Sequence, residues 1–415
     1  MRLVYKFILK DKNAETQLLE LCKVSKCLYN QALYTINQSI TNDNKWLFYN
    51  DLDKIMKTTY NLENEINYRL LPAQVSQQCL KQLDKNVKSY IRSIKDYSKN
   101  PSKYKGKPKM PKYKKTVNSL LYTNQQAKIT KDGYIQFRKG FLVEIPQWHK
   151  YGNDLMNMQQ VRVNPLYNGK IIEIEIVYLK ECDSNVVGSG IAGIDLGLNN
   201  FVTMVTSVDK PILINGKGIK SYNQFFNKCL SKTKSELDLV NGKKSSNKVR
   251  QLYVKRDNYL NDIYHKVSRF IVNYCVKNGI GAIAVGLNKG WKDSINIGNK
   301  NNQAFCDIAH SKFIDMLTYK CEMAGIKISV HEESYTSKCD ALALEKIEKH
   351  ETYMGNRVKR GLFQSSVGKL INADVNGALN IARKVFGDSG LIPQIINSGF
   401  LYNPVKFNNV VQLCC

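Results

Sequence analysis

Hydrophobic and polar positions repeat with two different periods over the first 180 residues. Residues 2–10 alternate, which predicts a β-strand. Apolar positions then recur at helical spacing, loosely from Leu18 to Leu33 and nearly every four residues from Val75 to Ile94. From Ser119 the period returns to two. Short strands are predicted at 120–123, 127–130, 134–138, 142–145, 161–163 and 171–178, with turns at 131–133 and 168–169.

This change of period predicts a β domain that carries a helical insertion. Residues 1–10 and 116–185 would form a small antiparallel β-barrel or sandwich. Residues 11–115 would be a helical insertion that ends in a basic linker. Residues 183–190 have the composition of an interdomain linker.

Strands alternate with helices in the second half. Strands are predicted at 191–197, 201–206, 211–215, 280–285 and 326–333, and a long basic helix pair at 219–277. Further helices are predicted at 311–324 and 372–381. Mixed strands and helices after a β-hairpin favour a ribonuclease-H-like α/β domain over 190–385. Residues 386–415 remain a C-terminal tail without a predicted role.

The net charge of +27 over 415 residues indicates a polyanionic partner, because such an excess of positive charge repels itself in the free protein. The alternative is a basic surface without a specific partner. Clustering of the charge and its interleaving with tyrosines favour nucleic acid.

The clearest cluster is the tract 99–115, which three prolines and a glycine should keep free of regular structure. Lysines suit phosphate contact and tyrosines can stack on bases. A solvated linker is the alternative, but the tract joins two structured regions. The residues expected to bind nucleic acid here are Lys103, Tyr104, Lys105, Lys107, Lys109, Lys112, Tyr113, Lys114 and Lys115.

The 11 scattered cysteines include no C-x-x-C pair, which favours a reducing compartment and argues against structural zinc. The N-terminus lacks the apolar core of a signal peptide, and no apolar run is long enough to span a bilayer. We expect a cytoplasmic protein without a membrane partner, associated with the nucleoid when it is bound to DNA.

Two carboxylates of the second half have unusual surroundings. Asp195 lies in the apolar run 191–197, and a buried unpaired charge is costly, so such a residue is usually ion-paired or metal-bound. Asp374 follows Asn372, a potential helix cap, and would lie in the first helical turn. The bare helix face at Gly377 suits a metal and a phosphate. The structural alternatives are a turn-capping Asp195 and an Asp374 that only stabilises its helix.

Three segments resemble the split RuvC motifs of the TnpB (OrfB) family, which is related to the type V CRISPR effectors and the Fanzor proteins. They are Gly193-Ile194-Asp195-Leu196-Gly197, Tyr335-Thr336-Ser337-Lys338 and Asn372-Ala373-Asp374-Val375-Asn376-Gly377-Ala378-Leu379-Asn380-Ile381. Residues 71–75 and 107–113 resemble the recognition helix of that family and its exit. The resemblance spans about residues 1–385 and implies a wedge-like β domain, a recognition insertion and a RuvC-like nuclease domain.

One family carboxylate is missing. The family usually has a glutamate where this chain has Gly286, which cannot bind a metal. We expect the third carboxylate from the strand at 326–333, which should neighbour the Asp195 strand. Glu333 is favoured and Glu332 is the alternative, since strand alternation does not decide between them. Such a relocation resembles the Fanzor proteins and some TnpB branches; otherwise the site is inactive.

The family zinc ribbon is also incomplete, because only Cys339 remains between Thr336 and Asp374. The resemblance therefore implies a degenerate ribbon-like insertion at 338–370 that folds without zinc. Its alternative is a surface loop. As a basic flap it would guide the DNA strand through Arg357, Lys359 and Arg360.

Taken together, the resemblance implies a transposon-encoded, RNA-guided DNA endonuclease. Asp195, Glu333 and Asp374 would bind Mg²⁺, with Mn²⁺ as a substitute, for phosphodiester hydrolysis. A transposon-derived guide RNA and target double-stranded DNA would be its partners, and a short flanking DNA motif would be read by the protein. The alternatives are a nuclease-dead RNA-guided repressor and a guide-independent RuvC-like nuclease.

Overall fold

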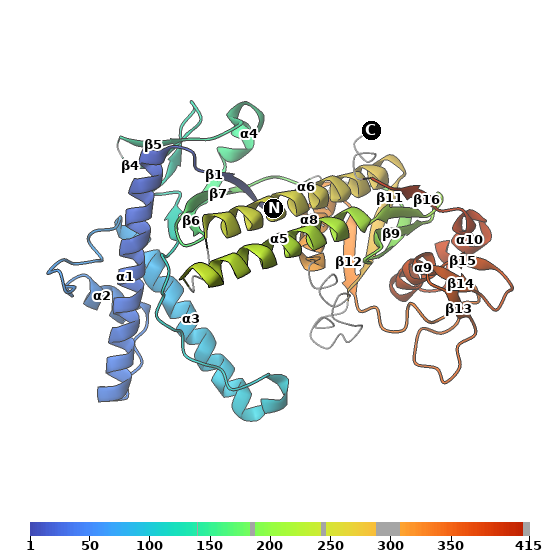
Figure 1. Ribbon diagram of the computed structural model, residues 1–415, viewed down its shortest axis with the longest axis horizontal. Helices are drawn as coiled ribbons and strands as arrows, with labels where there is room; N and C mark the ends of the chain where they lie inside the picture. Colours follow the sequence, from blue (N-terminus) through green and yellow to red (C-terminus); the bar gives the residue numbers. More distant parts are fainter. Residues whose placement is uncertain (139, 183–186, 242–245, 288–307, 410–415) are drawn as a thin grey trace. The chain divides into compact units, whose positions relative to one another are not determined.

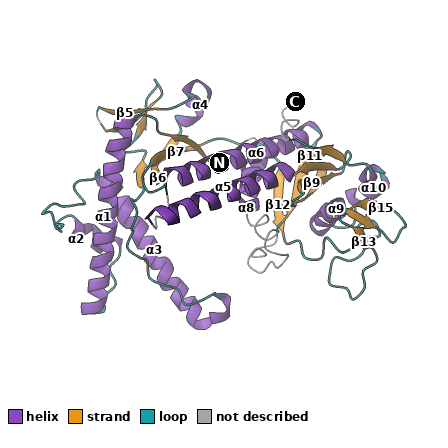
Figure 2. Ribbon diagram, in the orientation of Figure 1, coloured by secondary structure: helices purple, strands orange, loops and turns teal. Residues whose placement is uncertain are grey.

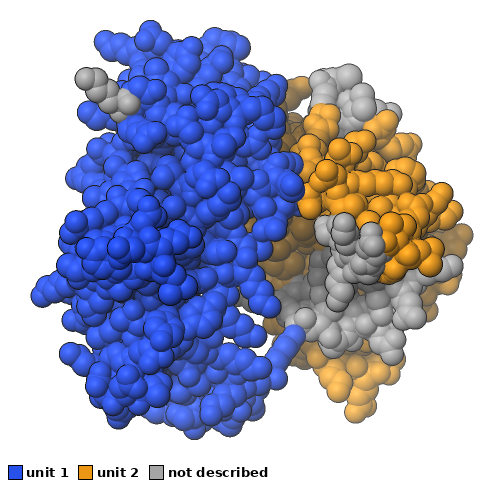
Figure 3. Space-filling view, turned by 60° about the vertical axis from the view of Figure 1, so that its left-hand side comes forward, with its two compact units in different colours: residues 1–181 blue, residues 182–415 orange. Residues whose placement is uncertain are grey.

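The computed structural model describes residues 1–138, 140–182, 187–241, 246–287 and 308–409. The chain forms two compact units, residues 1–181 and 182–415 (Figure 3). Of the predicted linker at 183–190, residues 183–186 lie outside the described part of the chain.

Three helices dominate the first unit: α1 (Lys12–Asp43), α2 (Tyr49–Met56) and α3 (Ala73–Lys99) (Figure 1). Asp11 caps α1, where its carboxylate accepts hydrogen bonds from the first backbone N–H groups. The predicted apolar stripe of α3 is buried at Val75, Cys79, Leu83 and Val87. The expectation of no regular structure over 99–115 was wrong at its start, because α3 runs to Lys99 and a 3₁₀ turn, η1, covers Pro101–Lys103.

The strands of the first unit form two antiparallel sheets. One has the order β1-β7-β6-β2, made by Arg2–Ile8, Ile171–Leu179, Met158–Leu166 and Leu120–Thr123. The other is β3-β4-β5, made by Lys128–Ile129, Tyr134–Arg138 and Phe141–Glu144, and α4 (Trp148–Leu155) follows it. The N-terminal strand therefore joins the β domain, as expected. In the described residues these strands pair as two open sheets and not as one closed barrel.

A six-stranded mixed sheet forms the centre of the second unit, in the order β12-β11-β8-β9-β10-β16. The first three strands of this unit are β8 (Gly190–Asp195), β9 (Asn200–Thr206) and β10 (Ile212–Asn215). Each pairs with the next in antiparallel orientation. β11 (Ile280–Gly286) and β12 (Lys327–His331) extend the sheet in parallel with β8. This mixed sheet agrees with the ribonuclease-H-like α/β fold expected from the sequence.

Helices cover both faces of this sheet (Figure 2). On one face, α6 (Asn247–Lys277) and α8 (His310–Met323) pack against alternate strand residues such as Ile194. On the other face, α9 (Ala373–Phe386) packs against Ile191 and Val205. The second basic helix, α5 (Lys217–Asn241), lies along α6. Residues 242–245 of the predicted helix pair lie outside the described residues.

Two further segments complete the unit. The predicted insertion at 338–370 is folded and not a loose surface loop: β13 (Asn356–Lys359), β14 (Leu362–Gln364) and β15 (Leu370–Asn372) form a small antiparallel sheet before α9. The tail forms α10 (Leu391–Asn397), the turn η3 (Phe400–Tyr402) and β16 (Val405–Phe407). β16 pairs with β10, so the tail forms one edge of the central sheet. The sequence alone predicted no role for the tail. Within the described residues, no helix is both long and apolar enough to cross a membrane.

Candidate functional site

Asp195 lies at the C-terminal end of β8, in the middle of the central sheet. Alternation along the strand places it on the same face as Ile191, which is the face covered by α9. The helix approaches closely here, since a Cβ on Gly193 would lie 2.3 Å from the Ala378 carbonyl oxygen. A Cβ on Gly377 would lie 3.1 Å from the Asp195 carboxylate. Glycine therefore leaves room beside this carboxylate, as the bare helix face suggested.

Asp374 lies in the first turn of α9, as predicted. The Asn372 side chain caps the helix by accepting hydrogen bonds from the backbone N–H of Asp374 (2.9 Å) and Val375 (3.3 Å). The Asn200 amide donates a 2.7 Å hydrogen bond to the Asp374 carboxylate, and the Arg357 guanidinium lies 3.7 Å from its other oxygen. Two groups that the sequence reading did not connect with Asp374 thus fix its side chain.

Glu333 reaches the site by lying over the missing side chain of Gly286. A Cβ on Gly286 would stand 2.5 Å from both Cγ and Oε1 of Glu333, which is closer than real atoms approach. The glycine at position 286 and the position of Glu333 are therefore one feature: the glycine leaves free the space that the glutamate occupies. Glu332 is exposed, and its carboxylate accepts a hydrogen bond from Ser334.

The expected route of Glu333 into the site was wrong. Its strand, β12, pairs with β11 and is not a neighbour of β8, because β11 lies between them. β12 also ends at His331, two residues before Glu333. His331 pairs with Gly286 across the sheet, so the chain leaves β12 next to the glycine. The Glu333 side chain can then cross the end of β11 only because residue 286 has no side chain.

Electrostatics couple the three carboxylates. Burial raises the pKa of Asp195 well above its ordinary value, and the charges of Glu333 and Asp374 raise it further, whereas Arg357 opposes this rise. Burial also raises the pKa of Glu333 to about 7. The ionised form of Asp195 is therefore disfavoured by burial and by its two acidic neighbours, and Arg357 offsets only part of this effect.

The chemistry of this donor set fits a hard divalent cation. Mg²⁺ and Mn²⁺ prefer carboxylate oxygens, and a cation would relieve the repulsion that raises the Asp195 pKa. As they stand, no three His, Cys, Asp or Glu side chains in the described ranges converge as a metal-binding group. Binding would therefore draw the carboxylates closer together, which a divalent charge favours.

Residues 103–115 form an ordered connection from the end of α3 back along α1. Lys103 pairs with Asp96 at 2.8 Å, and the Tyr104 hydroxyl donates to the same carboxylate at 2.6 Å. Lys114 turns inward: its ammonium lies 4.4 Å from the Tyr29 ring centroid, and burial lowers its pKa. The predicted residues whose side chains are exposed along this path are Lys103, Lys105, Lys107, Lys109, Lys112, Tyr113 and Lys115.

The three basic residues of the insertion that were predicted to contact DNA lie in two different places. Arg357 faces Asp374 at the carboxylate cluster, whereas Lys359 and Arg360 are exposed at the end of β13. Arg357 therefore belongs to the candidate site itself. Its role as an anion-binding residue stays a prediction, together with those of Lys359 and Arg360.

Comparisons with known proteins point the same way as the motifs. Residues 176–292 match the family model OrfB_IS605, described as "Probable transposase", and residues 310–381 match "Cas12f1-like, TNB domain". The chain is 30% identical over 136 residues to "CRISPR-associated endodeoxyribonuclease Cas12f1" of Sulfoacidibacillus thermotolerans, which covers 32% of this chain and 29% of that protein. It is 23% identical over 209 residues to "TnpB-like protein ORF457" of Acidianus two-tailed virus, which covers 48% of this chain and 43% of that protein.

The fold is also shared. The structure titled "Cryo-EM structure of the Cas12f1-sgRNA-target DNA complex" superposes with a TM-score of 0.53 at 14% identity, covering 90% of this chain and 83% of that chain. The sequence matches span less than half the length of either curated relative. The second family match falls within the unit that holds Asp195, Glu333 and Asp374, and the first does so except for residues 176–181. Residues 176–292 therefore resemble the OrfB_IS605 family and residues 310–381 the Cas12f1-like TNB domain, and the chain is similar in sequence to Cas12f1 and to a TnpB-like protein.

Proposed function

We propose that this protein is an RNA-guided DNA endonuclease, encoded by a transposon, that hydrolyses target DNA with Mg²⁺ beside a short flanking motif. The observation that carries the proposal is that the buried Asp195 carboxylate feels the charges of both Glu333 and Asp374, with Gly286 making room for Glu333. The names of its relatives support it, since one is an endodeoxyribonuclease and the matched structure is a complex with guide RNA and target DNA.

We also propose how the chain divides the work. Residues 1–10 and 116–185 act as the wedge-like domain, and 11–115 as the recognition insertion, which grips the guide–target heteroduplex by its shape and backbone. The exposed lysines of the tract 103–115 neutralise phosphates. Residues 190–385 form the nuclease, in which the relocated Glu333 replaces the carboxylate that is absent at Gly286.

The chain's own residues suit this chemistry. Asp195, Glu333 and Asp374 would hold the cation, while Asn200 and the Asn372 cap fix the Asp374 side chain. The Arg357 guanidinium, with 51% of its side chain exposed, can turn toward a phosphate without leaving the site. When bound, Mg²⁺ would polarise the phosphodiester and make water a better nucleophile at neutral pH.

The proposal is tested by plasmid cleavage. The protein is co-expressed with RNA from its own flanking region, the co-purifying RNA is sequenced, and a plasmid with a matching target beside randomised DNA is added. We expect cleavage with Mg²⁺ or Mn²⁺, none with EDTA, and enrichment of one flanking motif. Guide-dependent binding without any cutting would instead establish a nuclease-dead repressor. Equal cutting by RNA-free protein would establish a guide-independent nuclease.

Gly286→Ala should impair cleavage although it adds only one methyl group. The new Cβ would meet the Glu333 carboxylate end at 2.5 Å and force it out of its place. A displacement of about 1 Å at a catalytic group costs on the order of 100-fold in rate, which a single-turnover assay resolves. Ala284→Gly, two residues earlier on β11, is the control for a changed strand residue. An active Gly286→Ala variant would mean that Glu333 need not lie over this position.

A further inference from the structure

The segment 336–372 lacks the donors that a zinc ribbon needs. Structural zinc takes four ligands, mostly cysteine thiolates, but Cys339 is the only cysteine of this segment. Burial raises the pKa of this single Cys339 thiol. Its sulfur lies 3.5 Å from the Lys346 carbonyl oxygen and 3.7 Å from that of Glu348, as a weak donor. The donor set does not fit zinc.

A carboxylate stands next to this cysteine and gathers hydrogen bonds from two separate turns. The Asp340 side chain is fully buried. One oxygen accepts from the backbone N–H of Leu342 (3.1 Å) and Ala343 (3.3 Å). The other accepts from the Ser365 hydroxyl (2.8 Å) and from the Ser366 N–H (2.7 Å) and hydroxyl (2.9 Å). Five donors from both ends of the segment therefore converge on one charge.

Glu345 makes a second cross-link in the same segment. Its carboxylate accepts from the backbone N–H of Asp340 (2.6 Å) and of Met354 (2.9 Å). Met354 lies two residues before β13, and Ser365 follows β14 directly. The two carboxylates thus hold the two chain ends of the β13–β14 hairpin.

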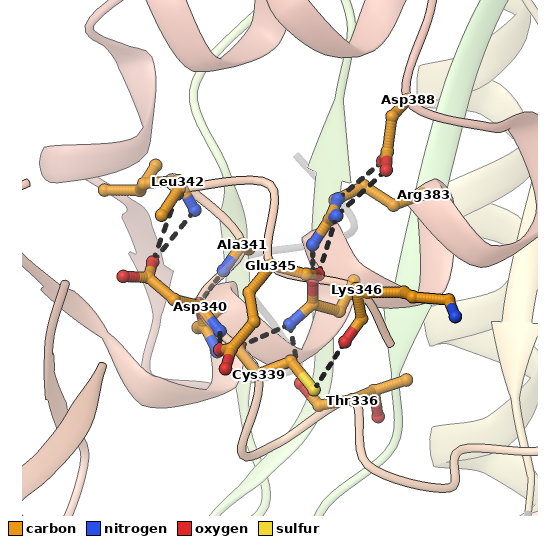
Figure 4. A network of polar contacts seen from close by, with 12 residues as sticks. Thr336, Cys339, Asp340, Ala341, Leu342, Glu345, Lys346, Arg383 and Asp388 are labelled. Carbon is orange, nitrogen blue, oxygen red and sulfur yellow. Dashed lines mark hydrogen bonds and ion pairs between the residues drawn. The ribbon is translucent and has the colours of Figure 1, made fainter. Parts of the chain in front are cut away.

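Helix α9 binds the segment through hydrogen bonds to the backbone of Cys339 and Glu345. Asn376 and Asn380 donate to the Cys339 carbonyl oxygen at 2.9 and 2.7 Å. Arg383 donates to the Glu345 carbonyl oxygen and is held by Asp388, as Figure 4 shows. One face of the helix that carries Asp374 in its first turn therefore binds the base of the segment.

We propose that the buried Asp340 carboxylate, with Glu345, replaces the zinc ion as the cross-link of this segment and so positions Arg357 beside Asp374. Arg357 lies on β13, whose start is held by Glu345 and whose partner strand is held by Asp340. Hydrogen bonds to a buried charge are stronger than neutral ones, so such a hub can stabilise a hairpin without metal. Asp340 is a positioning residue; its effect on cutting rests on the proposed nuclease function, whereas its effect on the hairpin does not.

The first test measures metal content and hydrogen exchange. We expect substoichiometric zinc in the purified protein, and no change in the exchange of residues 339–372 after treatment with a zinc chelator. In Asp340→Asn, an amide replaces one acceptor and faces N–H and O–H donors. Backbone amides of 354–366 should then exchange at least about tenfold faster, because local opening costs less. Stoichiometric zinc whose removal loosens the segment would overturn the proposal, as would unchanged exchange in the variant.

The second test asks whether Asp340 acts through Arg357. Single-turnover cleavage by Asp340→Asn should fall about 10- to 100-fold, as a misplaced catalytic group does. In an Arg357→Ala background the same change should cost much less, because the positioned group is already gone. Equal losses in both backgrounds would show a purely structural role and overturn the positioning claim.

Two further variants keep both tests decisive. Glu351→Gln removes an exposed acid of the same segment and should change neither exchange nor cleavage. If Asp340→Asn does not fold, Ser366→Ala removes a single hydroxyl donor and should still raise exchange in 354–366. The exchange and zinc measurements need no nuclease activity. They therefore test whether the Asp340 and Glu345 carboxylates cross-link the segment without metal, even if the protein cuts no DNA.

Discussion

Replacing Glu333 with alanine is expected to lower the single-turnover cleavage rate at least about 1,000-fold, which is about 4 kcal/mol of transition-state stabilisation. The substitution removes one of the three carboxylates that surround the candidate metal position. The Glu333 carboxylate end that lies over Gly286 would then be absent from that space. The measurement is guide-dependent plasmid cleavage at saturating Mg²⁺.

Glu332→Ala is the matched control. It removes the neighbouring charge, but its carboxylate is exposed and bonded to Ser334, so cleavage should stay within about threefold of wild type for a surface change. Loss of cutting in Glu332→Ala with retention in Glu333→Ala would reverse the assignment. A gain of function from Glu333→Gly combined with Gly286→Glu would support the exchange of positions further.

Asp195→Asn should have the other large effect: it should lower the cleavage rate but raise the thermal stability of the metal-free protein. Cleavage should again fall at least about 1,000-fold, since the central carboxylate is lost. The metal-free protein, however, should become more resistant to heat at neutral pH. The substitution removes the charge that is repelled by Glu333 and Asp374 and is kept from water by burial.

The pH dependence follows from the direction of the pKa shifts. The Asp195 pKa is raised, and that of Glu333 is about 7, whereas both groups titrate near 4 in an unfolded chain. The folded protein therefore holds more protons between these values, and its stability falls as pH rises from about 4 through about 7. Metal-free wild type should melt at a lower temperature at pH 8 than at pH 5.5. This decrease should be smaller in Asp195→Asn.

Magnesium should reverse the loss. A cation that binds only the folded state stabilises it by about 2.7 kcal/mol at 100 times its Kd, or several degrees in melting temperature. We expect this rise at pH 8 for wild type and little for Asp195→Asn, measured by calorimetry without nucleic acid. Glu332→Gln controls for a change in net charge. An equal rise in wild type and Asp195→Asn would place the stabilising ion elsewhere.

Local pattern was sufficient for most elements of the fold. The four-residue stripe of α3, the Asn372 cap of α9 and the turn at 168–169 each depend on neighbours in the chain, and each was predicted. The pairing of the N-terminal strand with β7 was also expected. The edge strand β16 was not, because its pairing with β10 depends on residues about 190 positions away and its own three residues carry little signal.

For the site, the sequence by itself indicated which carboxylates are candidates for binding a metal ion. Asp195 and Asp374 stood out because each acid lies in a setting that is otherwise apolar or made of small residues, and Gly286 because a side chain was expected there. Only the tertiary structure decided that Gly286 and Glu333 are one feature. The glutamate reaches the site from β12 across β11, a relation between side-chain volumes that no local pattern encodes.

The same limit explains Asp340, Asn200 and Arg357. In the sequence Asp340 and Asn200 are ordinary polar residues, and Arg357 was predicted to contact nucleic acid without any link to Asp374. Their partners are Ser365 and Ser366 for Asp340, and Asp374 for both Asn200 and Arg357. Hydrogen-bond and charge partnerships across such separations exist only after the chain has folded. Sequence thus determined the elements and the candidate acids, and packing decided how those acids meet and what holds them in place.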